Sequence, residues 1–351
     1  MKKTLFVAMI VGIGLSLLLV QPAPVTAADE PIILKTSIYS SAPPVPYGNA
    51  ITWYLRRMES ATNNRIKFQE YWSATLLPQK TEPEGLKAGI ADVAFFQARY
   101  QKSRLPLFYI TCLPATARDV RASCAAQNDL VKLPEIQQEF DKQGLVWLAP
   151  GTGVKRGIYT KDKPINSVAD FKGMKLRSVS TNILDGFGAT TVSISSSEMY
   201  EAFQRGVVEG IATSITGGIA WKIPEISKFY WDGDVGMVTM CGWMSKSRWG
   251  SLPKDIQETF RKIGEEEFPL MYDFYLRARG NATGLYDIFP KLGIKVTRPT
   301  AAELDKIQDL AKVDWEKHMK TLRKKGLPAQ KVLDEWLRLN RYYEEYYEVA
   351  R

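Results

Sequence analysis

Residues 174–213 read MKLRSVSTNILDGFGATTVSISSSEMYEAFQRGVVEGIAT and alternate between two kinds of pattern. Apolar runs in this stretch predict three short strands, at 174–179, 190–194 and 207–213. The segments between them predict helices, and the second one has a capping-box spacing, with Ser195 three residues before Glu198. Strands that alternate with short helices predict an α/β fold with a mainly parallel sheet.

The N-terminal part of the chain shows the same alternation. It predicts strands at 32–39, 65–72 and 90–96 and helices at 50–58 and before Gly89. Two segments also match in type, LKAGIADVAF at 86–95 and FQRGVVEGIA at 203–212. Each has a helix end, a glycine, two apolar residues and an acid, Asp92 or Glu209, before a strand. This weak repeat predicts two lobes of similar construction.

The C-terminal part of the chain is predicted to be mainly helical. Strands are predicted at 237–245 and 294–299, a helix begins near Ser251, and the chain from Ala301 onward is helical and charged. The last helix carries apolar residues at helical spacing: Val332, Trp336, Leu339 and Tyr343. We expect it to pack on its own protein, with a docking helix for a partner as the alternative. His318, the one histidine, lies in a polar helical segment and is expected to be solvated.

The first residues have the three-part pattern of a secretory signal. A basic start, MKK, precedes an apolar run from Leu5 to Val20, and small residues follow at Val25 and Ala27. The run of 16 residues is shorter than the ~20 that a spanning helix needs, so a membrane anchor is the less favoured alternative. We expect a signal peptide at 1–27, cleavage near Ala27 or Ala28, and export to the periplasm.

Charge and composition narrow the function. The formal net charge is +9, and the basic residues are spread along the chain, which disfavours nucleic-acid binding and suits small anionic ligands. One histidine, no Gly-x-Ser-x-Gly elbow and no P-loop disfavour an enzyme, although paired carboxylates stay open. The cysteine spacing supports no metal site; Cys112 and Cys124 either form a disulfide or stay free thiols.

Arg177 stands at the end of a predicted buried strand. A buried guanidinium without a partner is costly, so an anion must meet it. The planar fork of donors suits a carboxylate, either of a bound ligand or of an internal Asp or Glu. The pattern alone leaves both alternatives open.

Several segments resemble the substrate-binding subunit of TRAP (tripartite ATP-independent periplasmic) transporters, the family that includes receptors for four-carbon dicarboxylates and sialic acid. The specific resemblance lies in INSVADFKGMKLRSVS at 165–180 and FGATTVSISSSEMYEAFQRGVVEG at 187–210. NRIKFQEYWSATLL and LKAGIADVAF resemble the family's N-terminal lobe, and the likeness covers about residues 32–300.

The resemblance implies an α/β, two-lobed periplasmic binding protein fold with mixed sheets, a hinge crossed by strands, and long C-terminal helices. The expected parts are lobe I (28–153 plus 237–282), lobe II (154–236 plus 283–330) and a C-terminal helix (331–351). It implies a receptor without cofactor or catalysis, which captures an organic acid and delivers it to membrane permease subunits. A ligand-sensing receptor subunit and a binding protein of another importer class are the alternatives.

The resemblance also implies site residues. Arg177 takes the place of the arginine that clamps the ligand carboxylate, Arg156 that of a second arginine, and Ser180 and Gln97 those of polar contacts. Two positions depart from the family: Thr213 replaces an asparagine, and Ser196 replaces an aromatic residue. Aromatic residues near the expected lobe edges are Tyr39, Trp72, Phe95, Phe96, Trp221 and Trp243. Those that face the cleft favour a monocarboxylate with an apolar or aromatic body over a small four-carbon diacid.

Overall fold

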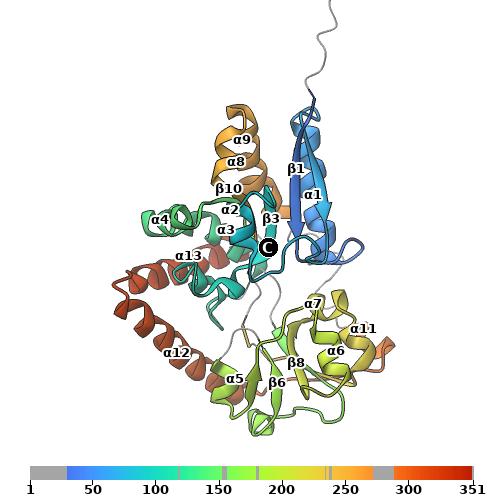
Figure 1. Ribbon diagram of the computed structural model, residues 1–351. Helices are drawn as coiled ribbons and strands as arrows, with labels where there is room; N and C mark the ends of the chain where they lie inside the picture. The colour runs from blue at the N-terminus through green and yellow to red at the C-terminus, as the bar shows by residue number, and fades with distance from the viewer. Residues whose placement is uncertain are drawn as a thin grey trace, which may run out of the picture. The chain divides into compact units, whose positions relative to one another are not determined.

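The computed structural model describes residues 30–117, 119–151, 156–178, 182–233, 235–236, 239–271 and 288–349. The predicted signal peptide at 1–27 and the predicted site residue Ser180 lie outside these ranges. Two β-sheets organise the described chain, each with helices packed around it (Figure 1).

The first sheet has the strand order β2-β1-β3-β10-β4. Its strands are β1 (Ile32–Ile38), β2 (Ile66–Tyr71), β3 (Val93–Gln97), β4 (Leu145–Ala149) and β10 (Met240–Ser245). β1 lies parallel to β2 and β3, whereas β10 lies antiparallel to β3 and β4. The sheet is therefore mixed, because its fourth strand, β10, runs antiparallel to both of its neighbours. This strand comes from a distant part of the chain.

The second sheet has the order β11-β9-β5-β8-β6-β7. Its strands are β5 (Arg156–Thr160), β6 (Lys175–Arg177), β7 (Thr190–Val192), β8 (Gly210–Ser214), β9 (Phe229–Trp231) and β11 (Lys295–Thr297). β6 lies parallel to β7 and β8, and β5 lies antiparallel to β8 and β9. Three parallel strands followed by an antiparallel one thus recur in both sheets.

The α-helices in the described ranges are α1 (Pro46–Ala61), α2 (Glu82–Lys87), α3 (Val120–Leu130), α4 (Pro134–Gln143), α5 (Asn182–Gly186), α6 (Met199–Gln204), α7 (Ile215–Ala220), α8 (Lys246–Ser251), α9 (Lys254–Lys262), α11 (Ile288–Lys291), α12 (Ala301–Lys324) and α13 (Ala329–Val349). The helix predicted at 195–206 begins later, at Met199. The Ser195 hydroxyl does donate to the Glu198 carboxylate, at 2.5 Å, but this contact closes a turn ahead of the helix.

The two segments of the predicted repeat form the same pair of hydrogen bonds, one pair in each sheet. The N–H of Lys35 on β1 donates to the Asp92 carboxylate (2.9 Å), and the Asp92 N–H donates to the Lys35 carbonyl (2.8 Å). In the second sheet Lys175 and Glu209 form the same pair of bonds, both at 2.8 Å. In each sheet an acid thus joins the residue before the third parallel strand to a lysine backbone on the neighbouring strand. The two sheets therefore share local construction as well as strand order.

Both segments of this repeat contain a glycine with positive φ, Gly89 at 72° and Gly206 at 74°. No atom lies within 4 Å of an added Cβ at either position, so an alanine there meets backbone strain only. We expect Gly89→Ala and Gly206→Ala each to lower the free energy of unfolding by about 1 kcal/mol in urea titrations. Gly250→Ala in α8 is the control, because that site is open and its φ is not positive. An equal loss at Gly250 would contradict this assignment.

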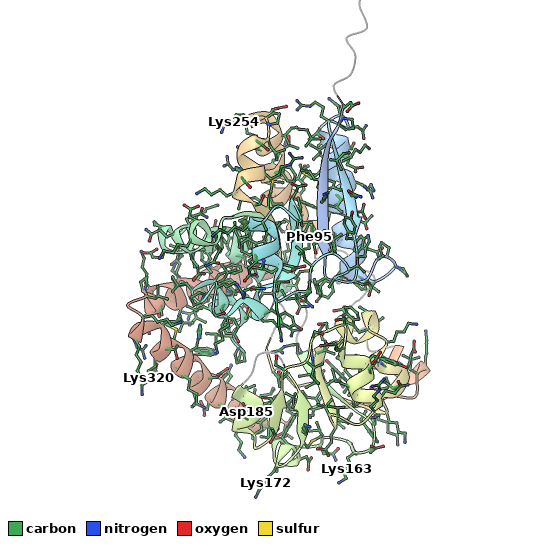
Figure 2. All side chains as sticks on the ribbon, viewed as in Figure 1. Phe95, Lys163, Lys172, Asp185, Lys254 and Lys320 are labelled. Carbon is green, nitrogen blue, oxygen red and sulfur yellow. The ribbon has the colours of Figure 1, made fainter. Side chains whose placement is uncertain are left out.

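The interior consists of one large cluster around the first sheet and two smaller ones around the second. Along β5, Ile158 enters one of the smaller clusters and its neighbour Tyr159 enters the other. This follows from the period of two in a strand, which sends successive side chains to opposite faces. Figure 2 shows Phe95 inside the first sheet, while exposed lysines such as Lys163 and Lys320 point outward.

Helix α12 packs against both sheets. Ile307 and Ala311 in its N-terminal half belong to a cluster of the second sheet, whereas Met319 and Leu322 belong to the cluster of the first. A capping box starts the helix, because Thr300 bonds the Glu303 N–H and the Glu303 carboxylate bonds the Thr300 N–H. We therefore propose that the boundary between the lobes falls within α12 rather than at residue 330.

The expectation of a solvated His318 is wrong. The side chain is only 3% exposed, Nε2 lies 3.0 Å from the Pro106 carbonyl oxygen, and the ring centroid lies 5.0 Å from that of Tyr109. Burial lowers the pKa of His318 to about 4, so the ring is neutral at neutral pH. The reason is its position in the half of α12 that faces the first sheet.

Helix α13 packs on α3, as predicted for a helix that docks on its own protein. Val332, Trp336 and Leu339 are buried, and the Trp336 Nε1 donates to the Thr116 hydroxyl at 3.0 Å. The three cysteines are buried free thiols, so the alternative of a disulfide between Cys112 and Cys124 is not realised.

The chain crosses between the sheets twice in this region, from β4 to β5 and from β9 to β10. The two crossings are hydrogen-bonded to each other: the Arg156 N–H donates to the Gly236 carbonyl (2.9 Å), and the Met240 N–H donates to the Gly151 carbonyl (2.7 Å). This is the expected hinge crossed by strands. It places Arg156 at the start of β5, directly beside the second crossing.

Candidate functional site

A small cavity lies where the connections of the two sheets meet. The residues that line it are Tyr39, Ser40, Tyr47, Gln97, Arg99, Ser196, Thr213, Ser214, Gly217, Ala220 and Trp221. Four of the predicted site residues are among them: Tyr39, Gln97, Ser196 and Thr213. None of these described lining residues carries a carboxylate.

The fold explains why these residues come together. Tyr39 follows β1, Gln97 ends β3, and Thr213 lies near the end of β8. Ligands of open α/β sheets bind at the carboxyl ends of the parallel strands, because the polar connections converge there. Both sheets contribute such ends, so the cavity takes polar side chains from each.

Arg177 ends β6 and is fully buried. Its Nε donates to the Ile194 carbonyl (2.8 Å), Nη1 to the Ala212 carbonyl (3.3 Å) and Nη2 to the Tyr100 hydroxyl (3.0 Å). Among the described residues it has no acidic partner, so the internal Asp or Glu that the sequence left open is not found there. Burial lowers the pKa of Arg177 to about 10, with Tyr100 opposing and Arg99 adding to that shift, and the group stays cationic at neutral pH.

Tyr100 connects Arg177 to the cavity wall. Its hydroxyl accepts the Arg177 hydrogen bond and lies 3.3 Å from the hydroxyl of Ser196, which lines the cavity. Burial raises the pKa of the Tyr100 phenol, but the Arg177 and Arg99 guanidinium groups outweigh it, so the net direction is downward. Two hydrogen bonds, through the phenol of Tyr100, therefore connect Arg177 to Ser196 in the cavity wall.

Arg156 is also fully buried, and its Nη2 donates to the Val235 carbonyl at 2.7 Å. Burial, followed by the charge of Arg99, lowers the pKa of Arg156 to about 9. The side chain is held by the second crossing of the hinge and does not line the cavity.

Arg99 was not among the residues predicted from the sequence. It lies in the 3₁₀ turn after β3 (η1, Ala98–Gln101), lines the cavity, and is only 3% exposed. Its Nε and Nη1 have no hydrogen-bond partner in the part of the chain that the structure describes. The signal in the sequence was present: FFQAR, like MKLR, places an arginine at the end of a buried apolar run.

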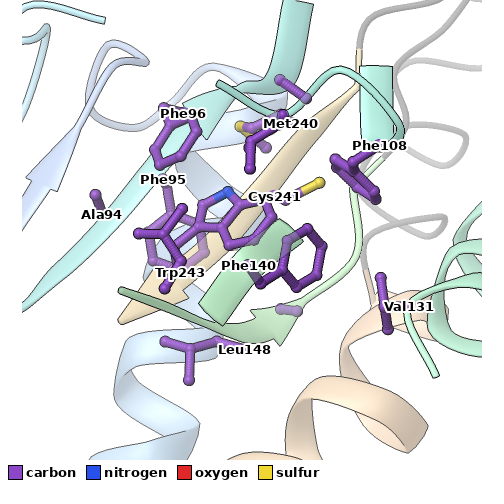
Figure 3. Packing of buried hydrophobic residues seen from close by; sticks show 14 of the residues in the cluster. Ala94, Phe95, Phe96, Phe108, Val131, Phe140, Leu148, Met240, Cys241 and Trp243 are labelled. Atoms are coloured by element: carbon purple, nitrogen blue, oxygen red, sulfur yellow. The ribbon is translucent and has the colours of Figure 1, made fainter. Parts of the chain in front are cut away.

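The structure places two predicted site residues in the core instead of the cavity. Trp243 and Phe96 are fully buried, and their rings stack with centroids 5.4 Å apart (Figure 3). Trp243 also packs edge-on against Phe108 and Phe140. Their positions on adjacent strands of the first sheet explain this, because Phe96 points to the face opposite its neighbour Gln97. Neither residue lines the cavity, and the core residue Phe95 does not line it either.

Trp72 is half-buried against the same core, and its Nε1 donates to the Glu70 carboxylate at 3.0 Å. It does not line the cavity. The aromatic residues that do are Tyr39, Tyr47 and Trp221. In the described ranges no group of three His, Cys, Asp or Glu side chains is arranged to hold a metal ion. A search of the same ranges finds no helix with the length and apolarity of a membrane span.

Two lobes with mixed sheets, crossing strands and a polar cavity at the strand ends define a solute-binding protein of the periplasmic type. The family model of bacterial extracellular solute-binding protein, family 7, matches residues 39–322. The chain belongs to this family.

Curated relatives agree with this assignment. A solute-binding protein of Albidiferax ferrireducens is 26% identical over 75% of this chain and 78% of its own length. The C4-dicarboxylate-binding periplasmic protein DctP of Rhodobacter capsulatus is 26% identical over 69% and 73%, and the sialic acid-binding periplasmic protein SiaP of Vibrio cholerae is 26% identical over 76% and 83%.

Solved structures show the same fold. A TRAP solute-binding protein of Rhodoferax ferrireducens with copurified benzoate has a TM-score of 0.81 at 20% identity, over 90% of this chain and 99% of that one. A marine metagenome TRAP protein with 3-hydroxybenzoate also has a TM-score of 0.81, at 20% identity over 90% and 99%. A further Rhodoferax ferrireducens protein with bound malonate has a TM-score of 0.74, at 22% identity over 89% and 98%.

Proposed function

We propose that this protein is the periplasmic receptor of a TRAP-type transporter, which captures an organic acid through Arg177 and delivers it to the membrane permease subunits. One observation carries the proposal: a fully buried guanidinium that has no acidic partner among the described residues. A buried cation of this kind is stabilised when a ligand brings the missing negative charge.

The contacts of Arg177 suggest how the acid is held. The ligand carboxylate replaces the Tyr100 hydroxyl as the acceptor of the Nη2 hydrogen bond. The Tyr100 hydroxyl then donates a hydrogen bond to the carboxylate. The Ser196 hydroxyl lies 3.3 Å from the same phenol oxygen. Closure of the lobes excludes water from this bridge, which strengthens each charge-assisted hydrogen bond.

The cavity wall suggests the rest of the ligand. Tyr39 and Trp221 offer ring surface, whereas Thr213 stands where the resemblance expects an asparagine. This combination suits an apolar or aromatic body, in line with the benzoate and 3-hydroxybenzoate of two structural relatives. We propose that no bond is made or broken, and that residues 1–27 direct export and are cleaved.

Thermal unfolding of the mature protein with matched acids and amides tests this function. We expect benzoate and phenylacetate to raise Tm, and the neutral benzamide and phenylacetamide to leave it unchanged, because only the acids meet Arg177. A free ligand concentration of 100 times Kd adds about 2.7 kcal/mol to the free energy of unfolding. Equal stabilisation by the amides, or no shift with any organic acid of a broad panel, would contradict the proposal.

A further inference from the structure

Arg99 has an environment that the proposed carboxylate bridge at Arg177 does not explain. The guanidinium lines the cavity, is nine-tenths or more buried, and has two N–H groups, Nε and Nη1, without a hydrogen-bond partner in the described chain. The ring of Tyr100 lies 5.4 Å from the guanidinium carbon. A buried donor without an acceptor destabilises the folded protein, and more so when it is charged.

The charges around the cavity are also unbalanced. Arg99, Arg156 and Arg177 are all buried and close enough to act on one another, because Arg99 contributes to the lowered pKa of both others. Among the described residues no carboxylate lines the cavity, and no acid pairs with Arg99 or Arg177. A ligand with one carboxylate neutralises one of these cations and leaves Arg99 unmatched.

We infer that Arg99 is a further ligand-binding arginine and that it holds a second carboxylate, so that the substrate is a diacid with an apolar or aromatic body between its two acidic groups. The inference rests on the proposed function and deepens it. It changes the ligand expected from the sequence, a monocarboxylate, because that expectation did not include Arg99.

The two arginines, Arg177 and Arg99, belong to different sheets. Arg177 belongs to β6 of the second sheet, whereas Arg99 belongs to the turn after β3 of the first. A diacid therefore bridges the two lobes with one carboxylate on each. A monoacid held by Arg177 alone leaves Arg99 of the first lobe unmatched, beside neutral lining residues such as Tyr39 and Gln97.

Calorimetry with two matched pairs, benzoate with isophthalate and pentanoate with glutarate, tests the inference. We expect at least one diacid to bind the wild-type protein at least tenfold more tightly than its monoacid. Arg99→Gln is expected to remove this preference, with at least a tenfold loss for the diacid and less than threefold for the monoacid. Arg177→Gln is expected to weaken both members of the pair.

Two further variants test whether the effect is specific to the Arg99 side chain. Arg104→Gln removes an arginine five residues away that pairs with Glu84 and does not line the cavity, and it should change neither affinity. Arg99→Lys keeps a charge and should keep part of the diacid preference if Arg99→Gln does not fold. Monoacids that bind the wild type as well as diacids, or equal losses for both acids in Arg99→Gln, would overturn the inference alone. Failure of all four acids to bind would overturn the inference, and failure of the broad panel of organic acids as well would overturn the proposed function.

Discussion

Arg177→Lys is expected to weaken the binding of the organic acid at least tenfold, which corresponds to about 1.4 kcal/mol. Lysine keeps the charge but replaces the planar fork with a point charge on a flexible stem. In the present structure the fork makes three hydrogen bonds at once, to the Ile194 and Ala212 carbonyls and to Tyr100. An ammonium group cannot hold both carbonyls and still offer two parallel donors to a carboxylate. Isothermal titration calorimetry with an acid that stabilises the wild type measures the loss.

The matched control is Arg205→Lys, the same exchange at a helix end where the side chain is exposed and pairs with Glu201. It should leave the affinity unchanged. The folded state of Arg177→Lys is checked by its thermal unfolding without ligand. An unchanged dissociation constant in a folded Arg177→Lys protein would exclude Arg177 from the site and remove the main support for carboxylate binding.

Arg177 is buried without an acidic partner among the described residues, whereas its role in ligand binding stays a prediction. A charged residue that ends an apolar strand must find an anion or reach solvent, and the resemblance favours a ligand as that anion. Arg99 follows the same rule but lies two residues beyond β3, in a 3₁₀ turn. Which way a side chain in such a turn points depends on tertiary contacts, so the sequence did not indicate that Arg99 faces the cavity.

The core positions of Phe96 and Trp243 were not predicted from the sequence for a different reason. Every residue of β3 and of β10 is buried, so neither strand shows an alternation that separates a core face from a site face. Phe96 and Gln97 are therefore indistinguishable by burial pattern, although one packs in the core and the other lines the cavity.

His318 illustrates a signal that was present but not used. The buried residues of α12 include Ile307, Ala311, Asp314, His318 and Leu322, which follow a spacing of three or four. The lysines around His318 occupy the other faces of the helix and made the segment look wholly polar. Helical phase predicts the burial of His318, whereas local composition does not.

Trp243→Ala is expected to destabilise the protein by about 3–5 kcal/mol, the range for removal of a large buried aromatic side chain. The indole is fully buried and packs against Phe96, Phe108, Phe140 and Trp147, with centroid distances of 4.8–5.6 Å. Because this cluster lies in the core of the first sheet, no neighbouring ring can fill the space without leaving its own contacts. Urea unfolding followed by circular dichroism measures the loss.

Trp243→Phe separates a core role from a role in binding, because it leaves a smaller void and keeps a ring in the stack. We expect this variant to lose stability by a smaller amount than Trp243→Ala and to bind the organic acid with the affinity of the wild type. Trp72→Ala is the comparison, since Trp72 is only half-buried and should cost less than Trp243→Ala. If Trp243→Phe kept its stability but lost affinity, the indole would have to reach the ligand, and its assignment to the core would be wrong.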